Sequence, residues 1–537
     1  MSTLTDYLNE VFRGKPPSQV VYISIGSTIA AKLIYDTLKQ GNLIKRAYHS
    51  AWRVFHFLGK PYITIAVKKA SKSITMPSAE GHFKPTELPE KSTSEEEVLK
   101  MLRQFHDDLD RSYEDNGFSG VVYHGGKMHT KFINDVMSLF QWSNPLHPEI
   151  FGATRKMEAE VVSMVLSMYH GHLLPDTCGT VTSGGTESIL MAMKTYRDWG
   201  RATRGIEHAS IVAPVTAHPA FDKAAVYFGM ELIKVPIDPR TMKVVPGELE
   251  KYIRYDTVVI VGSSPTFPHG VIDDIAALSE IAFRRGVGMH VDACLGGFIV
   301  PFLERTGRAA PVVDFRNRGV TSISCDTHKY GYSPKGTSTV LYRTMELRAF
   351  QFCCVTDWMG GMYCSPAVSG SKSGSVIAGT WAAMVRMGFE GYVACCAKIV
   401  TARETMTDGV ASIPGLRVIG DPIASVFAFT SDVVDIFDVG TELDRRGWVL
   451  NRLQFPSGLQ CSVTLLFTKK GAAEKFVQDL RESMQVVVEA QTKSFAEGKK
   501  VKINDSGVSL YGTVQRIPDR GIINDILVEF LNVYYTV

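Results

Sequence analysis

The sequence predicts an α/β protein in which a mostly parallel central sheet is covered by helices and followed by a smaller C-terminal α+β domain. Between residues 146 and 343, short apolar runs of strand length alternate with stretches of helical periodicity. Such alternation is typical of parallel sheets with helical crossovers. After a helix-like stretch at 389–413 the pattern changes to shorter strands and helices. A length of 537 residues is enough for two or three domains.

The N-terminal segment differs from the rest of the chain. Residues 20–31 are apolar and uncharged, and the stretch continues past Lys32 to Tyr35. A membrane-spanning helix needs about 20 apolar residues, so residues 20–35 fit three structures: a short membrane anchor, an amphipathic helix packed on the body, or an arm exchanged in a dimer. The residues after the segment are rich in Lys and Arg, which would place the remainder of an anchored chain in the cytosol.

The remaining elements follow in order. Residues 77–94 are rich in Pro, Ser, Glu and Lys and predict a linker, and the apolar spacing over 95–109 predicts an amphipathic helix. Further helices are expected at 158–169, 221–228 and 272–285, and strands at 210–214, 257–262, 287–291 and 321–324. We therefore expect four parts: an N-terminal segment (1–75), a linker and helical region (76–145), a large domain (146–385) and a small domain (386–537).

Composition narrows the class of protein. Hydrophobic residues make up 45% and charged residues 21% of the chain, and the formal net charge is +3. These are values of a soluble globular protein with sizeable cores, and no concentrated basic patch points to nucleic acid as a partner. The nine cysteines include no Cys-x-x-Cys pair and no Cys/His cluster with zinc spacing. We expect reduced, mostly buried thiols and no metal site.

The segment 324–336 carries the most informative residue, Lys329, which follows His328 and a predicted strand. A lysine in a loop after a buried strand can lose solvent, which lowers its pKa and frees the amine to attack an aldehyde. A lysine taken alone is more often a solvated surface charge. The function of Lys329 therefore depends on its neighbours.

Three further segments supply those neighbours. Asp292 ends a predicted strand, where open α/β sheets bind ligands, and its carboxylate suits either a protonated pyridine nitrogen or a helix cap. In the segment 179–188, a glycine pair and Thr186 precede a helix-like stretch, which suits a phosphate or an ordinary capped helix. His218 follows another strand, and its ring can stack on a cofactor or serve a structural role. Together these are the parts of a pyridoxal 5′-phosphate (PLP) site.

The sequence resembles the fold-type I PLP-dependent enzymes of the group II decarboxylase-like family, and within it the sphingosine-1-phosphate lyases. The resemblance covers most of the chain from about residue 95 to at least residue 400. It is carried by the motifs VVYHGG (121–126), SNPLHPEIFGATRKMEAEVV (143–162), GTVTSGGTES (179–188), FPHGVID (267–273), HVDACLGGF (290–298), DTHKYGYSPKG (326–336) and SGSKSGS (369–375).

The resemblance implies roles for individual residues. Lys329 matches the lysine that binds the cofactor covalently, Asp292 the partner of its pyridine nitrogen, and His218 the ring stacked on it. The family often has Gly-Ser-Arg-Pro-Gly where this chain has GSKSG (370–374), which puts the stiffness of that loop and any arginine contact in question. The other implied contacts are Gly184, Gly185, Thr186, His328 and the partner subunit's loop at Gly370 and Ser371 for the cofactor, and Tyr123, Asn144, His147 and Lys335 for a substrate phosphate.

The resemblance also implies a reaction and a setting. The expected activity is retro-aldol cleavage of a phosphorylated long-chain base to a fatty aldehyde and phosphoethanolamine. The expected assembly is a homodimer with shared active sites, on the endoplasmic reticulum membrane facing the cytosol, or in the cytosol if residues 20–35 do not span. Two alternatives remain: an amino-acid decarboxylase, which would use the same cofactor site but position a carboxylate, and a degenerate PLP fold acting as a scaffold or regulator.

Overall fold

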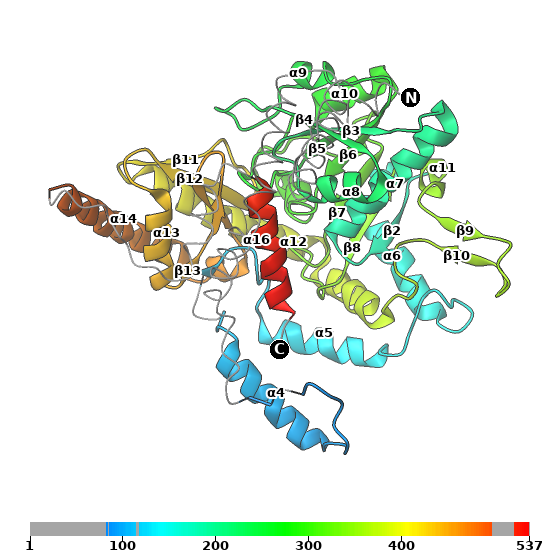
Figure 1. Ribbon diagram of the computed structural model, residues 1–537, viewed down its shortest axis with the longest axis horizontal. Coiled ribbons are helices and arrows are strands. Elements are labelled where there is room, and N and C mark those ends of the chain that lie inside the picture. The colour runs from blue at the N-terminus through cyan, green and yellow to red at the C-terminus, as the bar shows by residue number, and fades with distance from the viewer. Residues whose placement is uncertain (1–81, 84, 114–116, 497–519, 536–537) are drawn as a thin grey trace, which may run out of the picture. The chain divides into compact units, whose positions relative to one another are not determined.

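The computed structural model describes residues 82–83, 85–113, 117–496 and 520–535 (Figure 1). Of these residues, those from 111 to 496 belong to one compact unit, and those from 82 to 110 and from 520 to 535 belong to another. The predicted segment at 20–35 lies outside the described residues. Within the described ranges, no helix is both long enough and apolar enough to cross a membrane.

A seven-stranded sheet forms the centre of the larger unit (Figure 1). Only β8 runs antiparallel to its neighbours, β2 and β7, and every other pair is parallel. This confirms the prediction of a mostly parallel sheet. The strand order is β2 (Cys178–Thr182), β8 (Ser338–Tyr342), β7 (Ser322–Cys325), β6 (Gly288–Asp292), β5 (Thr257–Ser263), β3 (Ser210–Pro214) and β4 (Glu231–Val235).

Helices cover both faces of the sheet. Since successive side chains on a strand point to opposite faces, each strand contributes to a core on either side. Within β5, Val259 and Val261 contribute to the core under α7 (Gly185–Arg204) and α8 (Ala220–Phe228). Ile260, between them, packs into the core on the other side. That second core includes side chains of α6 (Gly152–Met168), α10 (Ile275–Arg285) and α12 (Gly374–Ala411). Helices on both faces agree with the predicted architecture.

Helix boundaries follow local capping. α10 begins at Ile275, three residues later than predicted, because the Asp274 carboxylate accepts a hydrogen bond from the backbone N–H of Ala277 at 3.0 Å. In the other unit, α4 (Glu95–Leu109) begins where predicted, after a capping box between Ser94 and Glu97. The remaining helices are α5 (Lys127–Leu139), α9 (Pro246–Glu250), α11 (Met345–Ala349), α13 (Ile436–Arg445), α14 (Ala472–Ala496) and α16 (Arg520–Tyr534).

α12 connects the central sheet to a second, antiparallel sheet. The helix is interrupted at Gly388, where φ is 58° and ψ is 177°, and the helix predicted at 389–413 corresponds to its second half. The predicted domain boundary at 385/386 falls inside α12 and stays a prediction. The second sheet has the order β11 (Leu416–Val418), β12 (Val426–Ser431), β15 (Gly458–Ser462) and β14 (Asn451–Leu453), and a short parallel pair joins β1 (Gly117–Phe118) to β13 (Trp448–Val449).

Candidate active site

The predicted site residues gather at one edge of the central sheet. β2, β3, β6 and β7 all run in the same direction, since β2 and β7 are both antiparallel to β8. The segments that leave their carboxyl ends carry Gly185, His218, Asp292 and Lys329. Open α/β sheets bind their ligands at this edge.

A cavity of about 400 Å³ lies at this edge, within the range usual for small-molecule sites. It brings together six of the predicted cofactor contacts from three separate chain segments. Its lining also includes two residues that the sequence did not single out, Cys294 and Asp326. The predicted residues among the lining are Gly184, Gly185, Thr186, His218, His328 and Lys329.

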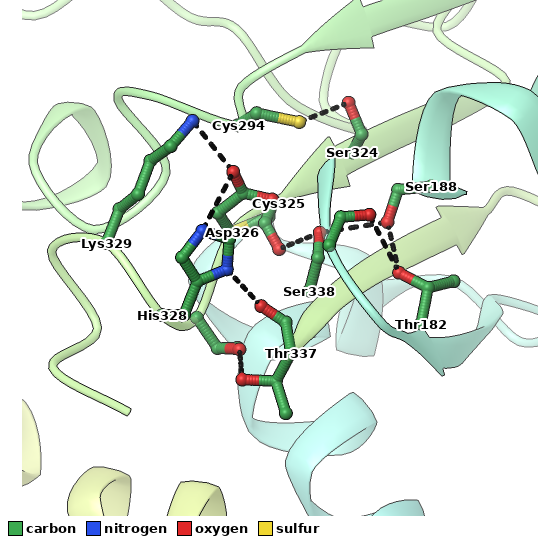
Figure 2. A network of polar contacts seen from close by, with 12 residues as sticks. Thr182, Ser188, Cys294, Ser324, Cys325, Asp326, His328, Lys329, Thr337 and Ser338 are labelled. Carbon is green, nitrogen blue, oxygen red and sulfur yellow. Dashed lines mark hydrogen bonds and ion pairs between the residues drawn. The ribbon is translucent and has the colours of Figure 1, made fainter. Parts of the chain in front are cut away.

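Lys329 is held by a carboxylate three residues before it. Its Nζ lies 2.8 Å from Oδ2 of Asp326, whose side chain is only 2% exposed (Figure 2). Burial is the largest single effect on Lys329 and acts against the charged amine. The negative charge of Asp326, with smaller contributions from Cys294 and Tyr123 and from the hydrogen bond to Asp326, outweighs it, so the pKa of Lys329 lies above its ordinary value. The sequence-based expectation of a lowered pKa is therefore wrong. The sequence analysis predicted the loss of solvent around Lys329, but it did not predict the counter-charge of Asp326, three residues earlier in the chain.

Asp326 is the functional residue that sequence reasoning missed. One carboxylate oxygen pairs with Lys329, while Oδ1 is buried and has no hydrogen-bond partner. A buried carboxylate oxygen left unsatisfied is costly unless a ligand completes it. The signal was present in the sequence, because an acid three residues before the lysine lies within the same motif.

Asp292 is the last residue of β6 and is not among the residues that line the cavity. Its Oδ1 accepts a hydrogen bond from the backbone N–H of Cys294 at 3.0 Å and lies 3.4 Å from the Ser324 hydroxyl. The Cys294 thiol in turn lies 3.2 Å from that hydroxyl (Figure 2). Two acids are therefore connected to the site: Asp326 lines the cavity, and Asp292 is hydrogen-bonded to Cys294, which also lines it.

The amino terminus of α7 forms one wall of the cavity. A Cβ atom on Gly185 would come within 2.7 Å of Asp326 Oδ1 and 2.8 Å of the Cys294 thiol, so only glycine fits there. The Glu187 carboxylate accepts hydrogen bonds from the backbone N–H and the hydroxyl of Ser183, both at 2.6 Å. These contacts fix the turn before the helix, whose first N–H groups are suited to an anion.

Two histidines complete the lining. The Nδ1 atom of His218 accepts a hydrogen bond from the backbone N–H of Ala220 at 3.1 Å, which fixes the orientation of its ring. The Nδ1–H of His328 donates to the carbonyl of Thr337, and its Nε2 lies 3.9 Å from Asp326 (Figure 2). Burial lowers the pKa of His328, so the neutral ring is favoured.

A second cavity of about 460 Å³ adjoins the first and shares His328 with it. It is lined by two of the predicted phosphate contacts, Tyr123 and Lys335. The Lys335 Nζ lies 5.0 Å from the centre of the Tyr123 ring. Burial, followed by the charge of Lys329, lowers the pKa of Lys335, and burial raises the pKa of Tyr123 to about 12. The Tyr123 hydroxyl therefore stays protonated and can donate a hydrogen bond.

The other two predicted phosphate contacts lie elsewhere in the chain. The Asn144 side-chain oxygen accepts hydrogen bonds from the backbone N–H groups of Leu146 at 3.1 Å and Lys372 at 3.2 Å. His147 has an exposed ring with Nδ1 3.5 Å from Glu149. Within one chain, the structure does not bring either residue into the cavity of Tyr123 and Lys335.

The loop in which this chain departs from the family pattern is anchored in another way. Lys372 forms an ion pair with Glu158 on α6, and Ser373 caps α12 by accepting a hydrogen bond from Val376. Ser371 lines a neighbouring cavity together with Ser183, whereas Gly370 is exposed with open space around its Cα. The lysine and serine thus hold the loop where the family pattern has arginine and proline.

The residues of the first cavity fit PLP. The amine of Lys329 and the amino terminus of α7 line the same space, which suits an aldehyde at one end of a ligand and a phosphate at the other. The unpartnered Oδ1 of Asp326 points to a polar group that the protein alone does not supply. Gly185, whose place a side chain cannot take, keeps the helix terminus open.

Comparisons with known proteins agree with this arrangement. The family model described as "Pyridoxal-dependent decarboxylase conserved domain" matches residues 79–431. A sphingosine-1-phosphate lyase of Drosophila melanogaster is 37% identical over 543 residues, covering 100% of this chain and 98% of the relative. The matched domain is pyridoxal-dependent, so PLP is the cofactor of this chain.

Two solved structures have the same fold as this chain, but only one of them is similar enough in sequence to support the family. The structure of a Burkholderia pseudomallei sphingosine-1-phosphate lyase aligns with a TM-score of 0.75 at 41% identity, covering 79% of this chain and 98% of that chain. A Lactobacillus brevis glutamate decarboxylase aligns with a TM-score of 0.66 at 22% identity, covering 77% and 97%, and shows the shared fold alone. The chain belongs to the sphingosine-1-phosphate lyase family of PLP-dependent enzymes.

Proposed function

We propose that this chain is a PLP-dependent aldehyde lyase that cleaves sphingosine 1-phosphate or its dihydro form into a long-chain aldehyde and phosphoethanolamine. Its relatives bear the name of this activity. One structural observation carries the proposal: a second cavity with a cation, Lys335, lies next to the cavity that holds Lys329 and shares His328 with it. A substrate with an amine and a phosphate requires two such adjacent sites.

The second cavity suits a phosphate because of the groups that line it. Lys335 supplies an exposed cation, and Tyr123 supplies a hydroxyl that keeps its proton. Hydrogen bonds between charged partners are about twice as strong as neutral ones, so an entering dianion gains more from this pair than a neutral headgroup does. An anion there would also offset the repulsion between Lys335 and Lys329.

The chemistry requires one bond to break and one proton to be delivered. The substrate 3-hydroxyl loses a proton as the bond between C2 and C3 breaks and the aldehyde leaves. C2 then gains a proton to give phosphoethanolamine. When bound, PLP supplies the electron sink for this cleavage.

The residues of the chain have distinct duties in this reaction. Lys329 would hold the cofactor and, as an ammonium stabilised by Asp326, carry the proton destined for C2. Asp292 would keep the pyridine nitrogen protonated, and His218, whose ring is fixed by the Ala220 N–H, would pack against the cofactor ring. The first N–H groups of α7, around Thr186, would bind its phosphate.

We also propose a homodimer in which Gly370 and Ser371 reach the cofactor site of the partner subunit. The exposure of this loop supports the proposal, as does the placement of Asn144 and His147 outside the cavities of their own chain. By the family resemblance, residues 20–35 would attach the enzyme to the endoplasmic reticulum, and the Lys- and Arg-rich residues after them would place the catalytic part in the cytosol. Sedimentation and membrane fractionation test these two proposals separately.

Product analysis tests the activity. The purified protein, loaded with PLP, is incubated with sphingosine 1-phosphate and, separately, with a panel of amino acids. Aldehyde and phosphoethanolamine in equal amounts are expected from the first, and the Lys329→Ala variant should form neither. Carbon dioxide from an amino acid without any aldehyde would overturn the proposal in favour of a decarboxylase.

A further inference from the structure

A small hairpin outside the active-site cavities brings two cysteines together. β9 (Cys353–Val355) and β10 (Tyr363–Ser365) form an antiparallel pair in which Cys354 stands directly opposite Cys364. Figure 1 shows this hairpin extending beyond the helices that cover the central sheet. Both cysteines are exposed and both are free thiols.

The geometry suits a disulfide. The two sulfur atoms are 3.2 Å apart, about 1 Å more than a disulfide bond length. Opposed residues of antiparallel strands have Cα atoms about 4.5–5.5 Å apart, within the range of about 4.4–6.8 Å that disulfides bridge. The bond therefore needs a small side-chain movement and no rearrangement of the backbone.

The pairing is selective within the chain. Cys353 is also exposed, but it stands opposite Ser365, and neighbouring side chains on a strand point to opposite faces. Of the other six cysteines, Cys395 is half-buried and five are buried. Only Cys354 and Cys364 combine exposure with a second thiol at contact distance. The five buried thiols are Cys178, Cys294, Cys325, Cys396 and Cys461.

We propose that Cys354 and Cys364 are a redox-active pair that forms a reversible disulfide within the chain when it meets a small disulfide such as glutathione disulfide. The thiolate of one cysteine attacks glutathione disulfide and releases one glutathione, leaving a mixed disulfide. The second cysteine attacks the protein sulfur of that bond and releases the second glutathione. Two protein thiols are oxidised, and one glutathione disulfide is reduced to two glutathione thiols.

The contact between the two thiols suits the exchange. The hydrogen bond to Cys354, followed by burial, raises the pKa of Cys364. The thiolate is the nucleophilic form, and whichever cysteine attacks first has the second sulfur at contact distance to resolve the mixed disulfide.

The hairpin is connected to the amino terminus of α7, which forms one wall of the first cavity. Beyond β10, the backbone N–H of Val368 donates to the Glu187 carboxylate at 3.0 Å. The same carboxylate holds Ser183 at the start of α7. A covalent bond between the strands therefore restrains the segment that reaches Glu187.

Peptide mapping after a nick in the hairpin tests the proposal. The tip carries the exposed apolar residues Trp358, Met359 and Met362, so chymotrypsin should cut the chain between the two cysteines. After treatment with glutathione disulfide, the two fragments should stay joined on a denaturing gel until a reductant is added. Titration of the native protein should fall from three exposed thiols to one.

Three variants make the outcome decisive. Cys364→Ser and Cys354→Ser should abolish the joined fragments, whereas Cys353→Ser should keep them. Joined fragments that disappear in Cys353→Ser, a bond between two chains, or mixed glutathione adducts alone would each overturn the proposal. Mass mapping of the joined peptide identifies the bonded residues directly.

Discussion

Lys329 and Asp326 form an ion pair at the carboxyl end of β7, with Nζ 2.8 Å from Oδ2. The carboxylate is almost completely buried and supplies the counter-charge that keeps the lysine protonated against the effect of burial. A protonated amine is a poor nucleophile, so this pair sets the pH at which the empty protein can take up its cofactor. Asp326 thus controls the residue that the sequence identified first.

Asp326→Asn should make cofactor attachment faster at neutral pH. Without the carboxylate, Lys329 loses the largest of the effects that oppose burial, so its pKa should fall and the neutral amine should become more abundant. The measurement is the rate of covalent PLP attachment to the cofactor-free protein across a pH series, trapped by reduction and weighed by mass spectrometry. Asp314→Asn, a change to a buried acid paired with Arg316, is the control. An identical pH profile in wild type and Asp326→Asn would contradict the role of the ion pair.

Asp292→Asn should bind PLP and lose most of its rate. A neutral amide cannot hold the pyridine nitrogen in its protonated form, and a positioned proton contributes about 100-fold or more to a rate. Cofactor content is measured by absorbance and turnover by aldehyde release. If Asp326→Asn, and not Asp292→Asn, shows this loss, then the acid on the cavity lining is the partner of the pyridine nitrogen.

Lys335→Gln should weaken phosphorylated substrates selectively. The lost charge-assisted hydrogen bond is worth about 1.5–3 kcal/mol, which corresponds to roughly a 10- to 100-fold rise in KM. Lys223→Gln is the matched control, because Lys223 also lies over a tyrosine ring, that of Tyr227, but on α8. Equal losses for phosphorylated and unphosphorylated bases would remove Lys335 from the phosphate site.

Gly185→Ala should destabilise the protein and impair PLP binding together. The added Cβ would approach Asp326 Oδ1 to 2.7 Å, and overpacking of this kind costs about 1–3 kcal/mol. Gly247→Ala is the control, since a Cβ there meets nothing within 4 Å and its position is also near the start of a helix. Urea unfolding of both variants gives the free energies. A Gly185→Ala protein as stable as Gly247→Ala would show that the wall can move.

Part of the fold could be predicted from the sequence because several strands of the central sheet, such as β3 and β5, are fully buried apolar runs. The strand Ser210–Pro214 was predicted with its observed limits, and continuous apolar runs are what strands covered on both faces require. α12 was only half predicted. Its first half lies before Gly388, where the chain departs from helical geometry and interrupts the periodicity.

The sequence by itself determined the family and the cofactor and singled out Lys329 as the predicted cofactor lysine, because these depend on motifs that are contiguous along the chain. Only the tertiary structure decided the charge on that lysine, since Asp326 acts through a distance of 2.8 Å that spacing alone does not give. It also decided which polar residues share a cavity, placing Tyr123 with Lys335 and leaving His147 apart. Electrostatic coupling depends on separation and burial in space, and both arise only when distant segments pack together.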